Sequence, residues 1–314
     1  MHLMKADLVF MGTPDFALPT LQAVAKSHRV LAVVTQPDRP AGRGRQLTAS
    51  PVKRRAHKLG LPVFQPEDVN SPDAVERIQH WNPTLIVVAA FGQILRAPLL
   101  SVPPHGCVNV HASLLPRWRG AAPINAAILH NDPETGVTIM KMDPGLDSGP
   151  ILSQRIIPIH RDDTAGTLFD RLAAEGARLL IDTLPAYLSG DIEPEPQDES
   201  LATYAPMLRR EDGELNFHKP ADFLARKVRA FSPWPGTFTT WESRRLIIHR
   251  AETADVTSPG IGVLTIHDGQ PAVGTGKGLL VLSELQPAGS KKMTGRAFLN
   301  GNPTWGNHPL DAFR

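Results

Sequence analysis

The chain has 314 residues, of which 41% are hydrophobic and 20% charged, so it has a globular composition and enough length for two domains. Its net charge of +2 excludes the strong global field of many nucleic-acid-binding proteins. One cysteine, no signal-peptide pattern and no apolar run long enough to cross a membrane together predict a soluble, cytoplasmic protein without disulfides or a membrane partner.

The first 190 residues alternate between strand-like and helix-like segments. Residues 8–11 are an apolar run that stops at Gly12, which predicts a strand, a tight turn and a helix through residues 21–26. Because Gly12 lacks the rest of a G-x-G-x-x-G pattern, we expect no dinucleotide site there. Further strands are predicted at residues 29–35, 62–64, 85–90, 106–110, 136–141 and 151–157, the last two as a candidate hairpin. Helices are predicted at residues 53–58, 72–80, 93–100, 121–130 and 164–188. This alternation indicates an α/β domain with a mostly parallel sheet.

Residues 36–45 are a loop punctuated by proline and glycine, and this loop opens a basic stretch. From Asp38 to Lys58, seven Lys or Arg residues stand against one Asp, a net charge of +6. A solvated surface is one explanation, and we favour it for residues 53–58. For the tip at Arg43 and Arg45 we favour contact with phosphates, because a basic patch on a near-neutral chain needs a partner more than a random surface does.

The apolar strand at residues 106–110 runs into polar side chains. Strand alternation places Cys107, Asn109 and His111 on one face, at the carboxyl end of the strand, which is where ligands bind in open α/β sheets. A lone Asn or His at such a position is more often a polar cap than a catalyst. Cys107 is expected to be a buried, unreactive thiol.

The acidic loop at residues 143–149, DPGLDSG, can bring a carboxylate to the same place. Taken alone, such a loop is usually only a turn. Together, Asn109, His111 and Asp147 supply an amide donor, an acid/base group and a carboxylate, which suits a reaction at a carbonyl. No Ser or Cys lies in a G-x-S-x-G turn, so we expect the attacking group to come from a substrate.

The composition changes after residue 189. Residues 190–206 are acidic and proline-rich, and we interpret them as a linker between a catalytic domain at 1–189 and a second domain at 207–314. In the second domain, one predicted helix at 222–230 is followed by strand-like runs at 237–241, 246–249, 263–266 and 279–282, which predicts a small β-barrel. This domain has fourteen Lys or Arg against ten Asp or Glu, a net of +4, which fits an RNA-binding module about as well as a solvated surface.

Two kinds of site are not expected. Residues 274–278, GTGKG, lack a Ser or Thr after the Lys and a following helix, so they predict a turn between strands and not a phosphate loop. The sequence has no H-E-x-x-H motif and no Cys/His cluster, so no metal site is predicted.

Several motifs resemble the folate-dependent formyltransferase family. The most specific is NVHASLLP at residues 109–116, together with Asp147. Further similar stretches are residues 10–16, 35–53, 117–124 and 136–140. Residues 229–235 and 285–289 are similar to the C-terminal domain of the family, so the resemblance covers nearly the whole chain.

The resemblance implies a Rossmann-like catalytic domain of the formyltransferase type and an OB-like C-terminal barrel. It implies transfer of a formyl group from 10-formyltetrahydrofolate, with no metal, to the amino group of methionine esterified to initiator tRNA. Carried over by position, the catalytic set is Asn109, His111 and Asp147. The implied folate site consists of Ser113, Leu114, Leu115 and Pro116, with Phe91, Gly92, Ile94 and Leu95. The implied tRNA contacts are Arg39, Arg43 and Arg45, with phosphate contacts added by the C-terminal domain of a monomeric protein.

Two positions depart from the family pattern. Phe91 stands where tyrosine is usual, and it keeps a ring without the hydroxyl. Asn125 stands where glutamine is usual, which leaves one polar contact undefined.

Three alternatives share parts of this pattern. A formyltetrahydrofolate hydrolase would use the same site with water as acceptor, and a related transferase would act on a small amine such as a glycinamide ribotide or an amino sugar. The basic loop at Arg43 and the extra C-terminal domain argue against the hydrolase. The basic loop at residues 35–53 argues against the small-amine transferase, because a small acceptor needs no such basic segment. An RNA-binding protein without catalysis would not need Asn109, His111 and Asp147 intact.

Overall fold

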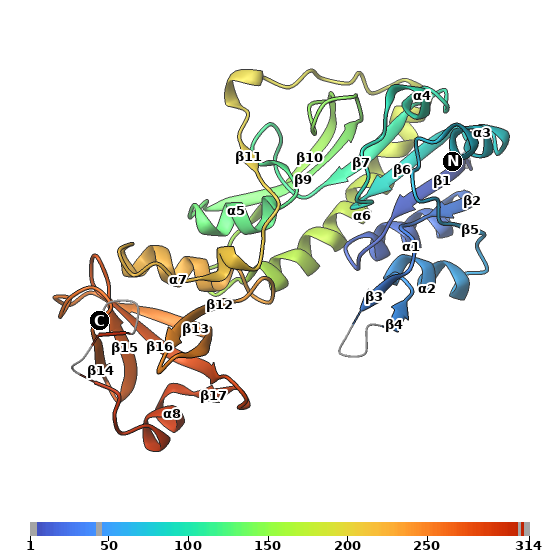
Figure 1. The fold of residues 1–314 in the computed structure, drawn as a ribbon. Helices are drawn as coiled ribbons and strands as arrows, with labels where there is room; N and C mark the ends of the chain where they lie inside the picture. The colour runs from blue at the N-terminus through green and yellow to red at the C-terminus, as the bar shows by residue number, and fades with distance from the viewer. Residues whose placement is uncertain (1–4, 42–45, 307–308, 311–314) are drawn as a thin grey trace. The chain divides into compact units, whose positions relative to one another are not determined.

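A seven-stranded sheet forms the centre of the first part of the computed structural model, which describes residues 5–41, 46–306 and 309–310 (Figure 1). The strand order is β10-β9-β7-β6-β1-β2-β5. The bounds are β1 (Asp7–Gly12), β2 (Arg29–Val34), β5 (Val63–Phe64), β6 (Leu85–Ala89), β7 (Cys107–His111), β9 (Glu134–Lys141) and β10 (Ile151–Pro158). The pairs from β7 to β5 are parallel, whereas β9 is antiparallel to β7 and β10 to β9. The mostly parallel sheet and the β9–β10 hairpin are therefore confirmed.

Helices connect these strands. Their bounds are α1 (Ala17–Ser27), α2 (Pro51–Lys58), α3 (Pro72–His80), α4 (Ala97–Leu100), α5 (Pro123–Leu129) and α6 (Ala165–Ser189). Helices α2 and α3 begin alike: Ser50 or Ser71 accepts a hydrogen bond from a backbone N–H of the first turn, and a proline follows it. Proline suits that position because its missing N–H would have no partner inside the helix. No helix in the described ranges has both the length and the apolar character needed to cross a membrane.

Apolar residues cover both faces of the sheet and position its carboxyl edge. On one face, Val9 and Met11 of β1 and Cys107 of β7 pack in a cluster with residues of α3 and α4. On the other face α6 approaches closely, because a Cβ at Gly176 would lie 2.6 Å from Val110 Cγ1. Asn109 follows Cys107 on its face, at the point where the apolar cluster ends.

Two local predictions are wrong. The predicted helix at residues 93–100 is only α4, because Pro98 has no N–H for the carbonyl of Ile94 and its ring would clash there. The predicted loop at residues 36–45 contains the strand β3 (Arg39–Ala41), which pairs antiparallel with β4 (Gln46–Thr48) just beyond it. Neither strand shows the apolar alternation from which a strand is predicted. Arg43 and Arg45 lie outside the described residues.

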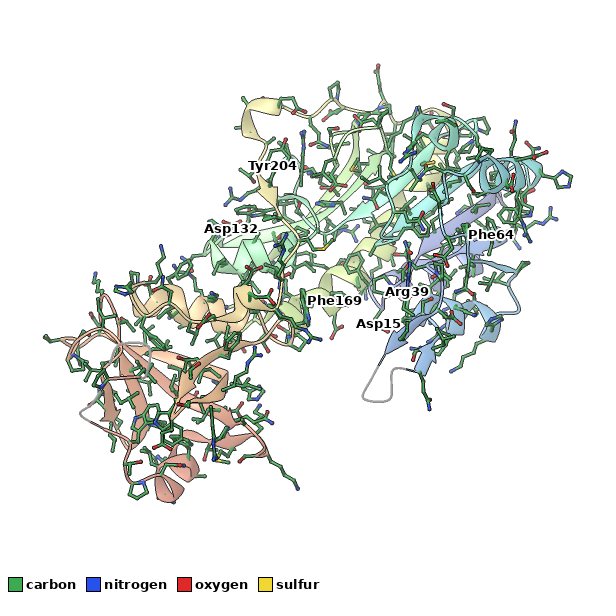
Figure 2. All side chains as sticks on the ribbon, viewed as in Figure 1. Asp15, Arg39, Phe64, Asp132, Phe169 and Tyr204 are labelled. Atoms are coloured by element: carbon green, nitrogen blue, oxygen red, sulfur yellow. The ribbon has the colours of Figure 1, made fainter. Side chains whose placement is uncertain are left out.

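The chain divides into two compact units, and the segments of each are not all consecutive. Unit 1 comprises Met1–Pro123, Glu134–Pro158 and Phe169–Ala205, and unit 2 comprises Ile124–Pro133, Ile159–Leu168 and Pro206–Arg314. Within unit 1, the predicted linker is folded against the sheet domain. It contains a 3-10 turn, η1 (Glu199–Leu201), and β11 (Tyr204–Ala205), which pairs with β8 (Arg119–Gly120). Tyr204, which Figure 2 labels, has a side chain that is 58% exposed.

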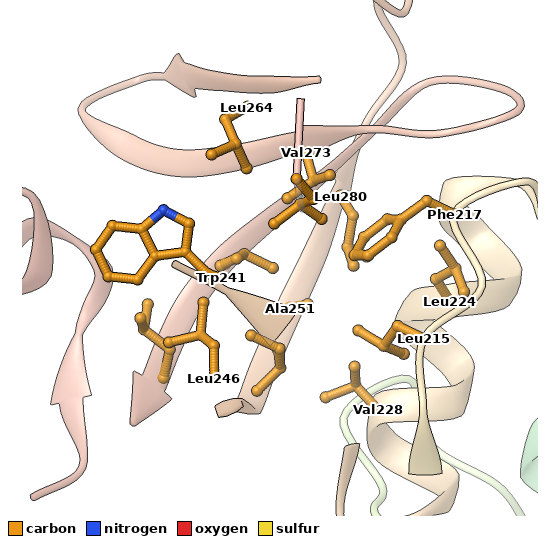
Figure 3. Close-up of a cluster of buried hydrophobic side chains, with 14 of the residues drawn as sticks. Leu215, Phe217, Leu224, Val228, Trp241, Leu246, Ala251, Leu264, Val273 and Leu280 are labelled. Atoms are coloured by element: carbon orange, nitrogen blue, oxygen red, sulfur yellow. The ribbon is translucent and has the colours of Figure 1, made fainter. Parts of the chain in front are cut away.

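Unit 2 is built on an antiparallel sheet. Besides most of α5 and the start of α6, its elements are η2 (Glu211–Gly213), α7 (Ala221–Ala230), β12 (Thr237–Trp241), β13 (Arg244–Ala254), β14 (Leu264–His267), β15 (Gln270–Gly274), β16 (Leu279–Pro287), β17 (Met293–Thr294) and α8 (Gly295–Gly301). The strand order is β12-β13-β16-β15-β14, with β17 on β16. Helix α7 contributes Leu224 and Val228 to the buried cluster around Trp241 (Figure 3). The turn at residues 275–278 between β15 and β16 is as predicted, whereas β15, β17 and α8 were not predicted from the sequence.

Candidate functional site

Strand β7 ends in the polar pair that the sequence singles out. Asn109 lies in register between Val88 of β6 and Met140 of β9, and it is half-buried between the buried residues Val108 and Val110. Its side-chain amide makes no hydrogen bond to any residue in the described part of the chain. A half-buried amide at the end of a parallel strand is therefore available to a ligand.

His111 is held by the backbone of the segment that follows it. Its imidazole is 6% exposed, and Nε2 lies 3.0 Å from the carbonyl oxygen of Trp118. Because a carbonyl oxygen only accepts, the hydrogen of this bond sits on Nε2. The other ring nitrogen, Nδ1, faces Oδ2 of Asp147 at 3.6 Å.

Asp147 lies in the loop between β9 and β10, as the sequence suggests. Its backbone adopts a φ of 50°, in the left-handed region that Asp and Asn tolerate better than most residues. Oδ2 accepts a hydrogen bond of 2.8 Å from the backbone N–H of Gly120. The structure thus brings Asp147 to His111 and leaves 16% of the carboxyl side chain exposed.

The segment at residues 113–116 is fixed from β9 and β10. The Ser113 hydroxyl donates to the carbonyl of Arg117 over 2.6 Å, so it is engaged within its own loop. Thr138 Oγ1 donates to Ser113 O and accepts from Leu115 N, and Gln154 Nε2 donates to Leu115 O. Sequence reasoning did not identify Thr138 and Gln154, although a threonine within an apolar strand was a signal for Thr138.

Close packing also fixes Leu114. A Cβ at Gly136 of β9 would lie 2.4 Å from Leu114 Cδ2 and 2.2 Å from the carbonyl oxygen of Arg155. Only a glycine allows this approach, so the chain at residues 113–116 lies directly on the hairpin.

The segment after β6 enters the same carboxyl edge of the sheet. Phe91 and Leu95 are both 2% exposed and belong to the apolar cluster, so their rings and methyl groups are core and face no solvent. The carbonyl of Phe91 accepts from Thr13 Oγ1 over 2.7 Å. Gly92 is exposed with a φ of 89°, and Ile94 is 73% exposed.

Of the three predicted tRNA contacts, only Arg39 is described. Its guanidinium lies 3.7 Å from Glu67 Oε2, with the two side chains 68% and 80% exposed (Figure 2 marks Arg39). An exposed pair at this distance contributes little to stability, so Arg39 stays accessible to another anion.

Three basic side chains on α7 are engaged within unit 2. Arg226 pairs with Asp222 and donates to Leu129 O, Lys227 donates to Glu214 O, and Arg229 donates to Asp163 O. Burial lowers the pKa of Lys227 and that of Arg229 from their ordinary values. The side chain of Asn125, one of the two departures from the family pattern, donates to Ala230 O over 2.6 Å.

Comparison with known proteins then decides the family. The formyl transferase family matches residues 5–184, and the formyl transferase C-terminal domain matches residues 207–303. The chain belongs to the formyl transferase family. Residues 185–206 lie between the two matched ranges of this formyl transferase.

Relatives of this chain are similar to it in sequence over nearly its full length. The methionyl-tRNA formyltransferase of Myxococcus xanthus is 48% identical over 299 residues, which cover 95% of this chain and 96% of the relative. That of Halorhodospira halophila is 49% identical over 301 residues, covering 95% and 97%. Among solved structures, an N-formyltransferase from Helicobacter canadensis is 18% identical with a TM-score of 0.67, covering 92% of this chain and all of that one. Glycinamide ribonucleotide transformylase 1 from Symbiobacterium toebii is 22% identical with a TM-score of 0.51, covering 61% and 94%. The structural likenesses show the fold.

In this formyl transferase the site offers donors and a carboxylate but no accessible thiol. Cys107 is buried, and burial raises the pKa of its thiol to about 12, so it stays protonated as the sequence analysis expects. Within the described ranges, no group of three or more His, Cys, Asp or Glu side chains is placed to hold a metal ion.

Proposed function

We propose that this formyl transferase moves the formyl group of 10-formyltetrahydrofolate to the free amino group of initiator methionyl-tRNA, giving N-formylmethionyl-tRNA. One observation carries the proposal: relatives named methionyl-tRNA formyltransferase are 45–49% identical over 94–95% of this chain. The sequence identity with these relatives extends over both units. It therefore favours the same formyl acceptor as well as the same formyl donor, because the acceptor determines what the second unit must bind.

The residues at the end of β7 fit a formyl donor. The half-buried amide of Asn109 has no hydrogen bond to a described residue. Its NH₂ group can therefore donate to the carbonyl oxygen of a bound formyl group. When bound, 10-formyltetrahydrofolate supplies the formyl carbon that the amine attacks. We propose that Asn109 Nδ2 donates to the formyl oxygen as negative charge develops there.

His111 and Asp147 then act as a pair. The Nε2–H of His111 is already bound to Trp118 O, so the imidazole can donate toward the reacting atoms only from Nδ1, when that nitrogen also carries a proton. Asp147 faces Nδ1 and holds a carboxylate oxygen ready to accept a proton from the amine, directly or through water. We propose that Asp147 takes this proton as the amine nitrogen bonds to the formyl carbon, and that Nδ1 of His111 shares it. The proton then passes to N10 of the folate as the bond between N10 and the formyl carbon breaks, so that tetrahydrofolate leaves.

The loops around this pair would bind the two substrates. We propose that residues 113–116 and the backbone of residues 91–95 line the folate site, because both segments follow neighbouring strands at the carboxyl edge. We propose that Arg39, Arg43 and Arg45 contact the acceptor end of the tRNA. Residues 207–314, as an OB-like domain after a linker at 190–206, would add phosphate contacts to a catalytic domain at 1–189. We propose a monomer acting in the cytoplasm.

A transfer assay tests the proposal directly. Purified protein, 10-formyltetrahydrofolate and methionyl-tRNA are mixed, and the formylated aminoacyl ester is followed, with uncharged tRNA and water-only controls. Product that depends on the charged tRNA supports the proposal. Folate turnover without formylated tRNA would instead indicate a hydrolase or a small-amine acceptor, and the basic loop would then be only a solvated surface.

A further inference from the structure

The side chain of Arg119 in β8 is a buried charge. It is 2% exposed, and its guanidinium binds both carboxylate oxygens of Glu199 at 2.7 and 2.9 Å. The bond to Glu199 holds the pKa of Arg119 above its ordinary value. A buried guanidinium is tolerated only when its N–H groups have fixed partners, so Arg119 is a rigid point in unit 1.

Gln197 connects this rigid point to the loop that carries Asp147. Its Oε1 accepts from Nε and Nη2 of Arg119 at 3.0 and 2.8 Å. Its Nε2 donates to the carbonyl oxygens of Asp147 and Gly149 at 2.8 and 2.7 Å. The carboxamide is therefore used at both ends, and an amide is the only common side chain that can accept on one side and donate twice on the other.

The same segment of chain holds β8 in place. Strand β11 pairs with β8, and a Cβ at Gly120 would lie 2.8 Å from the carbonyl oxygen of Ala205, at a φ of 109°. Gly120 also donates its N–H to Asp147 Oδ2. Asp147 is thus fixed at two atoms, its carboxylate and its carbonyl, and residues 197–205 stabilise both contacts.

We propose that Gln197 is a positioning residue for formyl transfer: it transmits the fixed position of Arg119 to the Asp147 loop and keeps that carboxylate beside His111. The inference rests on the proposed function, because it assigns Asp147 a part in that reaction. The loop needs these hydrogen bonds to keep one conformation. Asp147 has a left-handed backbone, and the nearby glycines Gly145 and Gly149 leave the backbone much conformational freedom.

The test is Gln197→Glu in the full-length protein, in the methionyl-tRNA transfer assay. Glutamate keeps the size and the bond to Arg119 but removes both donors and places an anion against two carbonyl oxygens. A displacement of about 1 Å at a reacting group costs roughly 10²-fold, so we expect kcat to fall ~10- to 100-fold while KM for folate and for tRNA changes less than about threefold. The melting temperature is measured in parallel, and Gln197→Ala, which removes the bonds without adding a charge, replaces Gln197→Glu if that variant does not fold.

A double-mutant cycle separates positioning from general stability. In an Asp147→Asn background, changing Gln197 should cost less than about threefold, because the group that it positions is already disabled. An equal loss in both backgrounds overturns the proposal, as does a Gln197→Glu enzyme of normal kcat. Asp198→Asn is the matched control, because Asp198 only caps the turn at Ser200, and it should keep normal kinetics. A wild-type protein that forms no formylated tRNA would refute the proposed function itself, which is a different result from active wild type with unaffected variants.

Discussion

Nδ1 of His111 lies 3.6 Å from Oδ2 of Asp147, and each of the two groups is held there by a backbone contact to another residue. Trp118 O fixes the imidazole and the N–H of Gly120 fixes the carboxylate. Trp118 and Gly120, two positions apart in the chain, therefore set the distance between the imidazole and the carboxylate that we propose act together. Such preorganisation lowers the cost of ordering the site when substrates bind.

Replacing His111 with alanine tests the role of the imidazole. We expect turnover to fall by at least about 10²-fold, the usual scale of a positioned acid/base group, while folate binding measured by fluorescence or calorimetry stays within about twofold. His80→Ala is the control, because His80 is an exposed residue of α3. Near-normal turnover of His111→Ala would remove the imidazole from the mechanism.

Replacing Asn109 tests the proposed oxyanion donor. Asn109→Ala should lower kcat by about 10²–10³-fold, as is typical for one such donor. Asn109→Asp should be no better, because it has similar size but offers an acceptor in place of the donor. The exposed Asn300→Ala in α8 serves as the control. Equal activity of Asn109→Ala and wild type would place the donor elsewhere.

Removing the charge of Arg43 tests the basic loop. Arg43→Ala should raise KM for methionyl-tRNA and reduce the slope of log affinity against log salt by about 1, while folate binding stays unchanged. Lys26→Ala removes one exposed charge from α1 and should change neither quantity. If Arg43→Ala weakens folate and tRNA equally, the loop does not have the assigned role.

The buried thiol of Cys107 predicts a reactivity and a pH dependence. With a pKa of about 12, only about one folded molecule in 10⁴ carries the thiolate at pH 8, against about one in ten for an ordinary thiol, so alkylation should be very slow until urea unfolds the chain. The folded pKa lies above the unfolded one, so this group's contribution to stability is complete below about pH 9 and declines as the pH rises toward 12. Cys107→Ala should lack that component of the alkaline decline in unfolding free energy, and rapid alkylation of the folded protein at pH 8 would contradict the burial.

The sequence predicts much of the site because local rules control it. Alternation along one strand put Asn109 and His111 at its carboxyl end, and the two glycines around Asp147 indicated a loop that returns. Gln197 could not be found in this way. It lies in an acidic, proline-rich stretch, 78 positions from Arg119, and no local pattern announces a contact at that separation.

In the fold too, elements with a clear local sequence pattern were predicted, and elements without one were missed. Strands with continuous apolar runs, such as β6, were located almost to the residue, because burial on both faces demands that composition. The β3–β4 pair consists of two three-residue strands, RPA and the exposed QLT, which are too short to show an apolar period. The missing helical turn before α4 depends on Pro98 and on side chains such as Gln93, whose Oε1 accepts from the N–H of Val69 over 2.8 Å.

The pairing of β8 with β11 has a consequence for how the protein is made. The hydroxyl of Thr203 accepts from the N–H of Trp118, 85 positions earlier in the chain, so the two strands meet only after all of α6 has been synthesised. In a nascent chain emerging from the ribosome, Asn109 and His111 of β7 are synthesised early. Residues 197–205, which fix the position of Asp147, are synthesised late. Shortened chains that stop at residue 184, where the first family match ends, would carry the proposed catalytic side chains without residues 197–205, which hold Asp147 in place.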